Sequence, residues 1–292
     1  MAASQSTAQS AVRTQSLYFE DFRPGQRWTS TARRITPEDL AAFTELSGDR
    51  HPLHTDPEWA ARTRFERPVL HGPFGIAAFL GFLHDMGLAG ESVIALLDTN
   101  WRYLKPSYVG DTLQCTLTVT RCRRTSDPHQ GVIHRHVVLE NQRGERVQEG
   151  TSAVLVHARG TGPDPAALAP GTVEWGSALA ELLAQDDQFA AATATWDGTI
   201  GLRSGDNEVQ LRVYLGRIID VVRRTPHGST FTLAADELTW AELLTGERND
   251  LVARMMRGQF HATGDAYEYL RLTKVLHLIT DAARTLAEEV RA

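Results

Sequence analysis

The segment "SGDRHPLHTD", residues 47–56, concentrates side chains that can do chemistry. A carboxylate and an imidazole stand five residues apart in it, Asp49 and His54, and groups of these types transfer protons as a general acid/base pair. The same residue types also bind metal ions, or form a solvated capping turn between two helices. The segment alone leaves these three interpretations open.

A metal site in this segment would have to use Asp49, His51, His54 and Asp56. Their spacing matches no standard zinc pattern, and no third histidine region is evidently coupled to them. We therefore expect no metal ion, and the acid/base interpretation is favoured over the metal site.

The elements around the segment fix where it lies. Thr36, Pro37 and Asp39 form a helix start, and Gly48 supplies the stop, so the segment begins where a helix ends. Asp56 is the expected cap of a second short helix. A third helix over residues 67–87 is apolar on nearly every face, so it must be wrapped by a sheet. Four strand-like segments can form that sheet, at residues 92–104, 111–124, 131–144 and 145–158.

Composition sets the domain plan. The 292 residues exceed the ~100–200 of one domain. A Gly/Pro/Ala-rich stretch interrupts the periodic pattern near the middle. The expected division is therefore a disordered tail over residues 1–15, a first domain over 16–158, a linker over 159–172 and a second domain over 173–292.

Three motifs of the first domain, "GDRHPLHTD", "RPVLHG" and "YLKPSYVGDTL", together resemble the MaoC-like family of (R)-specific enoyl-thioester hydratases and dehydratases. The resemblance implies an α+β hot-dog fold, in which a curved antiparallel sheet wraps around one long helix. It also implies that Asp49 and His54 are the catalytic pair. The family usually has asparagine two residues after the aspartate, where this chain has His51.

Hydration of an enoyl thioester needs a base for water, an acid for the α carbon and a stabiliser for the enolate-like oxygen. Asp49 and His54 suit the first two tasks, and backbone N–H groups at the helix start around Gly72 suit the third. No cofactor is required. The substrate-binding residues that we expect are Arg50, His51, Pro52, His71, Arg102 and Lys105, the last two facing the phosphates of coenzyme A or a carrier-protein arm.

The second domain shows strand-like alternation over residues 189–205, 207–224 and 229–237, followed by helical spacing over 235–265 and 266–290. This layout resembles the sterol-carrier-protein-2-like (SCP2-like) family, which implies an α/β sandwich enclosing an apolar tunnel. A stripe of Leu and Met at helical spacing is more often plain core than the lining of a tunnel.

The leading functional hypothesis is hydration of an enoyl thioester, or the reverse dehydration, on coenzyme A or acyl carrier protein in fatty acid, polyketide or specialised metabolism. Arg50 and His51 motivate a variant in which an amine or amino acid is the nucleophile (an aza-Michael addition). An alternative of another class is a non-catalytic protein that binds acyl thioesters and lipid. By resemblance we expect a homodimer.

Composition limits the partners and the compartment. The net charge of −6 gives no basic excess for nucleic acid. The longest apolar run, residues 74–83, is half of the ~20 residues needed to span a bilayer. The only two cysteines, Cys115 and Cys122, form no CxxC pair, and we expect both to be reduced in a cytoplasmic protein.

Overall fold

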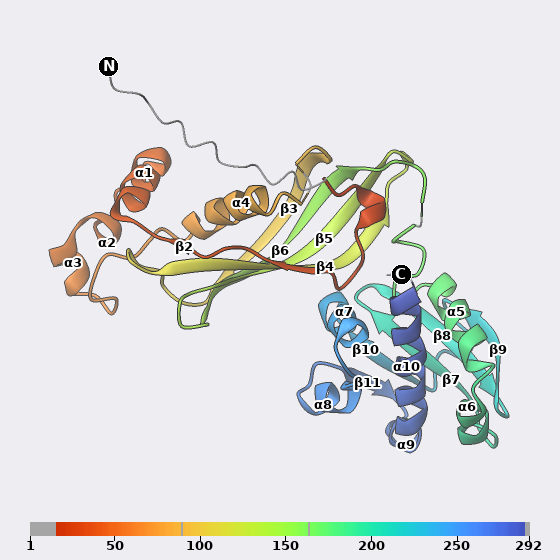
Figure 1. Cartoon of the computed structure of the whole chain (residues 1–292). Coiled ribbons are helices and arrows are strands. Elements are labelled where there is room, and N and C mark those ends of the chain that lie inside the picture. Colours follow the sequence, from red (N-terminus) through yellow and green to blue (C-terminus); the bar gives the residue numbers. More distant parts are fainter. Residues whose placement is uncertain (1–15, 89, 163, 290–292) are drawn as a thin grey trace.

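The computed structural model describes residues 16–88, 90–162 and 164–289, which form two β-sheets with helices packed on each (Figure 1). The tail expected over residues 1–15 lies outside the described residues. The elements of the first half are η1 (Phe19–Asp21), β1 (Arg27–Thr29), β2 (Arg33–Arg34), α1 (Pro37–Ser47), α2 (Pro52–Thr55), α3 (Pro57–Ala61), α4 (Phe74–Met86), β3 (Val93–Tyr103), β4 (Thr112–Arg124), β5 (Gln130–Glu140) and β6 (Arg146–His157).

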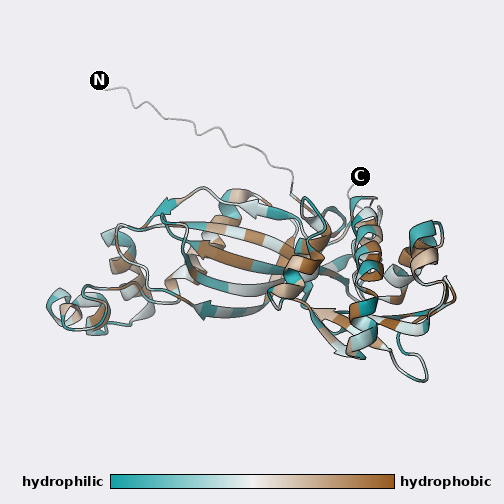
Figure 2. Cartoon of the chain, turned by 90° about the horizontal axis from the view of Figure 1, so that it is seen from below, coloured by the Kyte–Doolittle hydropathy of each residue, from teal (hydrophilic) through white to brown (hydrophobic). Residues whose placement is uncertain are grey.

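The first sheet is antiparallel, with strand order β1-β4-β5-β6-β3, and β2 pairs with β4 beside β1. Helix α4 lies along one face of this sheet (Figure 1). Its residues Phe74, Phe79 and Phe82 are buried in a core that Leu113 and Leu117 of β4 complete. Apolar and polar segments alternate along these strands (Figure 2), as expected where one face covers a helix. The sheet wrapped around α4 is the hot-dog arrangement.

Local start and stop signals are confirmed in this half. The Thr36 side chain accepts from the Asp39 N–H, the Asp39 carboxylate accepts from the Thr36 N–H, and Gly48 ends α1 at a φ of 71°. Asp56 caps α3 through the N–H groups of Glu58 and Trp59.

Residues 26–36 alternate as a single strand would, but they form two short strands, β1 and β2. The ladder with β4 breaks at Ser30, because the Ser30 carbonyl turns away to accept from the Gln114 side chain. The Ser30 hydroxyl accepts from the Cys115 N–H, and the Ser30 N–H donates to the Cys115 carbonyl.

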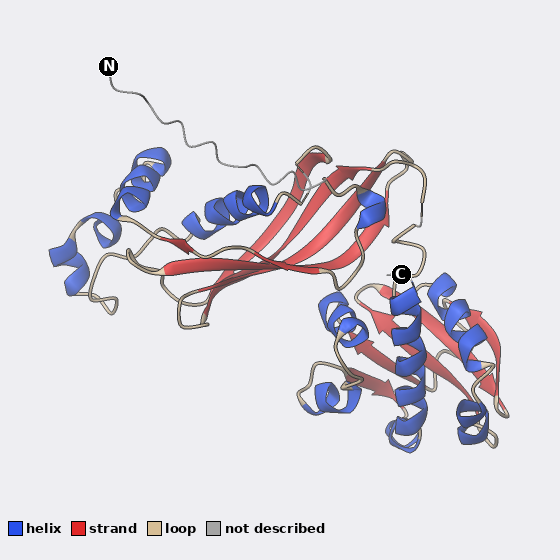
Figure 3. Ribbon diagram, in the orientation of Figure 1, coloured by secondary structure: helices blue, strands red, loops and turns tan. Residues whose placement is uncertain are grey.

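The second sheet has strand order β11-β10-β7-β8-β9, with β10 parallel to β7 and the other pairs antiparallel. Figure 3 shows α5, α7 and α10 on one side of it, and a separate core includes Trp175, Trp240 and Phe231. The elements are α5 (Val173–Leu183), α6 (Asp187–Ala192), β7 (Asp197–Ser204), β8 (Asn207–Tyr214), β9 (Arg217–Val222), β10 (Phe231–Ala235), α7 (Glu237–Thr245), α8 (Leu251–Met256), β11 (His261–Gly264), α9 (Ala266–Arg271) and α10 (Thr273–Glu289).

Three element predictions for this half are wrong. The helical spacing expected over residues 235–265 is divided into the helices α7 and α8, and residues 261–264 form the strand β11. The strand predicted from residue 189 begins only at Asp197, because Asp186 caps the short helix α6 through two backbone N–H groups. The single helix predicted over 266–290 is interrupted at Leu272, where α9 ends.

The two halves meet where α7 approaches β4. The Nη1 of Arg121 on β4 lies 3.0 Å from the Oε1 of Glu237 on α7. Residues 159–162 and 164–172 link the last strand of the first sheet to α5, and they form no helix or strand; residue 163 is not described. None of the helices in the described ranges is both long and apolar enough to cross a membrane.

Candidate active site

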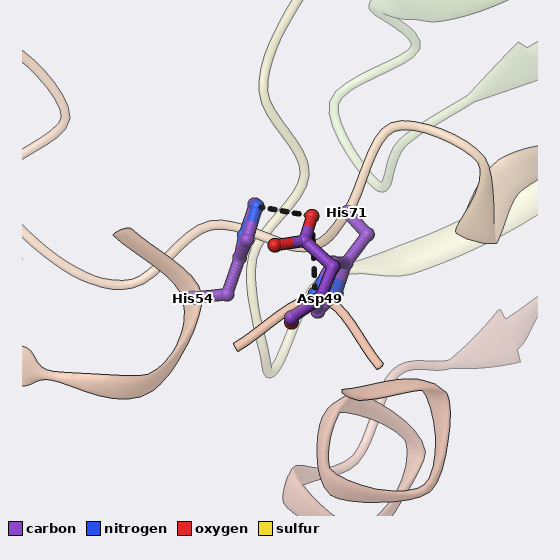
Figure 4. A group of neighbouring side chains, drawn as sticks. All are labelled: Asp49, His54 and His71. Atoms are coloured by element: carbon purple, nitrogen blue, oxygen red, sulfur yellow. Dashed lines mark hydrogen bonds and ion pairs between the residues drawn. The ribbon is translucent and has the colours of Figure 1, made fainter. Parts of the chain in front are cut away.

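Asp49, His54 and His71 meet at the end of α4 that faces α1 and α2 (Figure 4). Asp49 follows Gly48 in the loop after α1, His54 lies in α2, and His71 lies in the turn that precedes α4. The Asp49 Oδ2 is 3.8 Å from the His54 Nε2 and 3.9 Å from the His71 Nε2. The three side chains differ in their exposure to solvent: 53 % of the Asp49 side chain is exposed, 12 % of His54 and 2 % of His71.

The tautomer of His54 follows from its anchor. Its Nδ1 lies 2.7 Å from the Val69 carbonyl oxygen, which can only accept, so Nδ1 carries the proton. In the neutral ring Nε2 is then a bare acceptor, and it faces the Asp49 carboxylate at a distance too long for a direct hydrogen bond. Two acceptors at this separation suit a water molecule that donates to both.

Asp49 is held through its backbone and its second oxygen. Its Oδ1 accepts from the His51 N–H at 3.1 Å, and its carbonyl oxygen lies 2.8 Å from the His71 Nε2, which therefore carries a proton. The His71 ring stacks on the His54 ring with centroids 3.8 Å apart. Its Nδ1 is buried and has no hydrogen-bond partner among the described residues. His71 thus orients both members of the pair.

His71 is the third histidine that the sequence did not connect with this segment. One of the two reasons given above against a metal site is therefore wrong, and the reason from spacing is unaffected. Ligand atoms of Asp49, His54 and His71 lie within 4.8 Å of one another. Two features nevertheless oppose coordination. Stacked imidazole rings direct their nitrogen lone pairs side by side and not toward one point, and the His71 Nε2 already donates to the Asp49 carbonyl. The arrangement suits proton transfer better than metal binding.

A cavity of about 300 Å³ opens beside the two histidines. Asp49 is not among the residues that border it. Its lining is mostly apolar and includes two cationic side chains: His54, Arg64, Phe65, Val69, Leu70, His71, Gly72, Phe74, Gly75, Tyr103, Leu104, Lys105, Pro106, Ser107, Leu113 and Gln148.

Gly72 supplies a backbone donor at the helix start that has no acceptor among the described residues. Pro73 has no N–H, and the N–H groups of Phe74 and Gly75 donate to the carbonyls of His71 and Gly72. The N–H groups of Gly72 and Ile76 make no hydrogen bond to a described group, so more than one donor is free at this helix start. A side chain at Gly72 would have its Cβ 3.0 Å from the Tyr103 ring.

The turn before α4 is fixed from the sheet by a buried amide that sequence reasoning missed. The Gln148 Nε2 donates to the Gly72 carbonyl at 3.1 Å, and the Trp101 Nε1 donates to the Gln148 Oε1 at 2.7 Å. Gly75 leaves room for this contact, since a Cβ there would lie 1.9 Å from the Gln148 Oε1. The sequence offered no signal for this contact, because Gln148 stands on β6 among other polar residues, Glu149, Thr151 and Ser152.

The other expected substrate-binding residues are scattered. Arg50 pairs with Glu45 at 2.7 Å on the surface, and His51 uses its Nδ1 to cap α2, which begins at Pro52. Neither Arg50, His51 nor Pro52 borders the cavity.

The two expected phosphate-binding cations are separated from each other. Lys105 borders the cavity but pairs with Glu145 at 2.8 Å. Hydrogen bonds from Asn141, Lys105 and Arg143 lower the pKa of the Glu145 carboxyl to about 2. Arg102 instead lines a different cleft, together with Asp236 and Glu237 of the second half.

The fold and the site define a hot-dog protein with a carboxylate/imidazole pair at the start of its central helix. The family described as MaoC like domain matches residues 21–141. An (R)-specific enoyl-CoA hydratase of Rhodospirillum rubrum is 31 % identical over 143 residues, covering 49 % of this chain and 94 % of that protein. The chain belongs to the MaoC-like family of hydratases and dehydratases.

Two longer proteins are similar as well. Protein MaoC of Klebsiella aerogenes is 38 % identical over 114 residues, covering 39 % of this chain and 32 % of that protein. The crystal structure of a MaoC domain protein of Chloroflexus aurantiacus has a TM-score of 0.50 and 32 % identity, covering 53 % of this chain and 45 % of that one. This chain thus spans less than half the length of these two relatives. The family match ends at residue 141, before the second sheet begins.

Proposed function

We propose that this protein adds water to the double bond of an enoyl thioester, or removes water in the reverse direction, using Asp49 and His54. The observation that carries the proposal is that two acceptors, the Asp49 Oδ2 and the bare His54 Nε2, face each other at 3.8 Å beside a cavity bordered by the free N–H of Gly72.

In the hydration direction, a water molecule donates one hydrogen bond to each member of the pair. As its oxygen attacks the β carbon, one proton passes to the pair, and a proton is returned to the α carbon. The thioester oxygen gains negative charge and accepts from the Gly72 N–H, whose position depends on Gln148. The product is a β-hydroxyacyl thioester, and no metal ion or redox cofactor takes part in these steps.

Water is favoured over an amine as nucleophile. The amine variant needs a cation near the pair to hold the carboxylate of an amino acid, and Arg50 is engaged with Glu45. The thioester carrier, coenzyme A or a carrier protein, is proposed to enter past Arg64 and Lys105, which border the cavity and match the charge of a phosphate group.

The edge strand β3 supports a homodimer. It carries exposed Val93, Ile94, Leu96 and Leu97, between 37 % and 51 % accessible, along the edge of the sheet. A long apolar edge strand is a template for pairing with another strand, and we propose a second copy of this chain as the partner. For the second sheet with its helices, we propose the SCP2-like role of holding an acyl or lipid chain.

The test is mass spectrometry of a medium-chain enoyl-CoA incubated with wild type, Asp49→Asn and His54→Asn. The expected result is a water adduct of R configuration, formed at least about 100-fold more slowly by each variant, because general acid/base groups contribute ~10²–10⁴-fold. Binding of the thioester, measured by calorimetry, should persist in Asp49→Asn. Thioester binding by wild type without turnover would instead favour a binding protein.

A further inference from the structure

A second cavity lies at the opposite end of α4 from the candidate active site. It measures about 220 Å³ and shares no lining residue with the active-site cavity. The 13 residues of α4 separate the two ends by about 20 Å. Its walls are mainly apolar and come from α4, the following turn and strands of the first sheet: Phe22, Leu83, His84, Gly87, Leu88, Gly90, Val93, Leu117, Arg135 and Val154.

Arg135 is the unusual member of this lining. It lies on β5 and is only 7 % exposed. Its Nη2 donates to the Ser152 hydroxyl at 2.7 Å, directly across the β5–β6 ladder, while its Nε has no hydrogen-bond partner. In the part of the chain that the structure describes, no carboxylate lies within ion-pair distance of this guanidinium.

No other neighbour neutralises the charge. Cys115 interacts electrostatically with Arg135, but burial raises the pKa of that thiol to about 12, so it is uncharged near neutrality. Burial lowers the pKa of Arg135 to about 10, which leaves the guanidinium protonated. The Phe79 ring, 5.7 Å from the Arg135 Cζ, offers a cation–π contact only. A buried cation without a counter-ion is costly and favours binding of an anion.

We propose that this cavity binds an apolar carboxylate, with Arg135 as the partner of the carboxylate group. The planar guanidinium matches a carboxylate through two parallel hydrogen bonds, and the apolar walls match a hydrocarbon body. An engineered apolar cavity of about 150 Å³ holds benzene, so about 220 Å³ suits a short chain or ring. The carboxylate is either a free acid or the far end of an acyl thioester that occupies the active site, and the second source rests on the proposed function.

The test for the shared chemistry is calorimetric titration of the full chain with hexanoate and, as a neutral match, hexanamide. Wild type should bind hexanoate, and Arg135→Met should bind it about 10- to 100-fold more weakly, as expected when a buried charged hydrogen bond is lost. Hexanamide binding should be little changed. Arg123→Met removes an exposed arginine from the neighbouring strand and should leave hexanoate binding unaltered.

Stability separates this role from a structural one. Because Met fills the space without a buried charge, Arg135→Met should unfold at the same denaturant concentration as wild type or a higher one. Absence of hexanoate binding by wild type, or equal binding by Arg135→Met, overturns the proposal. A changed oligomeric state in Arg135→Met also overturns it, because a carboxylate of a second copy would then be the counter-ion.

Turnover distinguishes the two sources. If the carboxylate belongs to the substrate, Arg135→Met should lower kcat/KM for a long-chain enoyl-CoA with a terminal carboxylate at least about tenfold, and leave the methyl-terminated analogue unchanged. If it is a free acid, both substrates should respond equally. Asp49→Asn should lose turnover and keep hexanoate binding. If wild type turns over no enoyl thioester, the proposed function fails while the titration still decides the ligand of Arg135.

Discussion

Substitution of Gly75 by alanine tests the connection between the sheet and the candidate active site. In a helix, Gly→Ala normally stabilises by about 1 kcal/mol. Here the new Cβ would lie 1.9 Å from the Gln148 Oε1, so the amide must leave its place between Trp101 and Gly72. Overpacking costs ~1–3 kcal/mol, and two lost hydrogen bonds cost ~1 kcal/mol each. The net expectation is a loss of about 2–4 kcal/mol in the free energy of unfolding.

Gly81 provides the matched control, because it lies in the same helix and a Cβ there meets nothing within 4 Å. Denaturant unfolding should show Gly81→Ala to be as stable as wild type or up to ~1 kcal/mol more stable. The hydration rate should fall about tenfold in Gly75→Ala, since the Gly72 N–H loses its support, and stay unchanged in Gly81→Ala.

A double-mutant cycle identifies the cause. If the clash is with Gln148, then Gly75→Ala should cost little stability in a Gln148→Ala background, giving a coupling of ~1–3 kcal/mol. The reasoning is refuted if Gly75→Ala and Gly81→Ala have the same stability and rate, or if the two substitutions at 75 and 148 are additive.

Three further predictions concern single side chains. His71→Phe keeps an aromatic ring against His54 but loses the hydrogen bond to the Asp49 carbonyl, so kcat should fall about tenfold with little change in KM; an equal rise in KM would indicate a substrate contact instead. Leu97→Lys places a charge on the exposed edge of β3 and should convert a dimer to a monomer in light scattering; a wild-type monomer would remove that proposal. Burial, and then the charge of Arg121, lowers the pKa of His134 from its ordinary 6.5 to about 4. The unfolded chain therefore binds more protons there between these values, and stability should decrease as the pH falls from 6.5 to 4; His134→Gln should flatten this part of the unfolding-versus-pH curve.

Local signals in the sequence were enough for much of the fold of the first half. The capping residues Thr36, Asp39 and Asp56 act within one helical turn, so their effect can be read from neighbouring positions. The apolar helix α4 required a covering sheet, and alternation identified its strands. The break between β1 and β2 could not be predicted, because it depends on the Ser30 carbonyl accepting from Gln114 on a strand 84 residues away.

The candidate site shows the same limit. Asp49 and His54 lie in one segment, so residue type and spacing reveal them. His71 joins them only through the packing of the α4 turn on the α1–α2 loop, and Gln148 reaches Gly72 from 76 residues away. Two cations that were expected to bind the substrate instead form ion pairs with nearby carboxylates. Arg50 pairs with Glu45, and Lys105 pairs with Glu145. Sequence spacing does not reveal with which of several carboxylates a long, flexible cationic side chain forms an ion pair.

Strand β6 connects both ends of the central helix. Gln148 and Ser152 stand four residues apart on it, and residues at even spacing in a strand share a face. The first holds the turn where α4 begins, and the second holds Arg135 beside the cavity where α4 ends. One strand face therefore positions the oxyanion donor proposed for catalysis and the cation proposed for carboxylate binding. If a single substrate occupies both cavities, a shift of β6 must alter turnover and recognition of the carboxylate together. Two independent ligands would allow each to change alone.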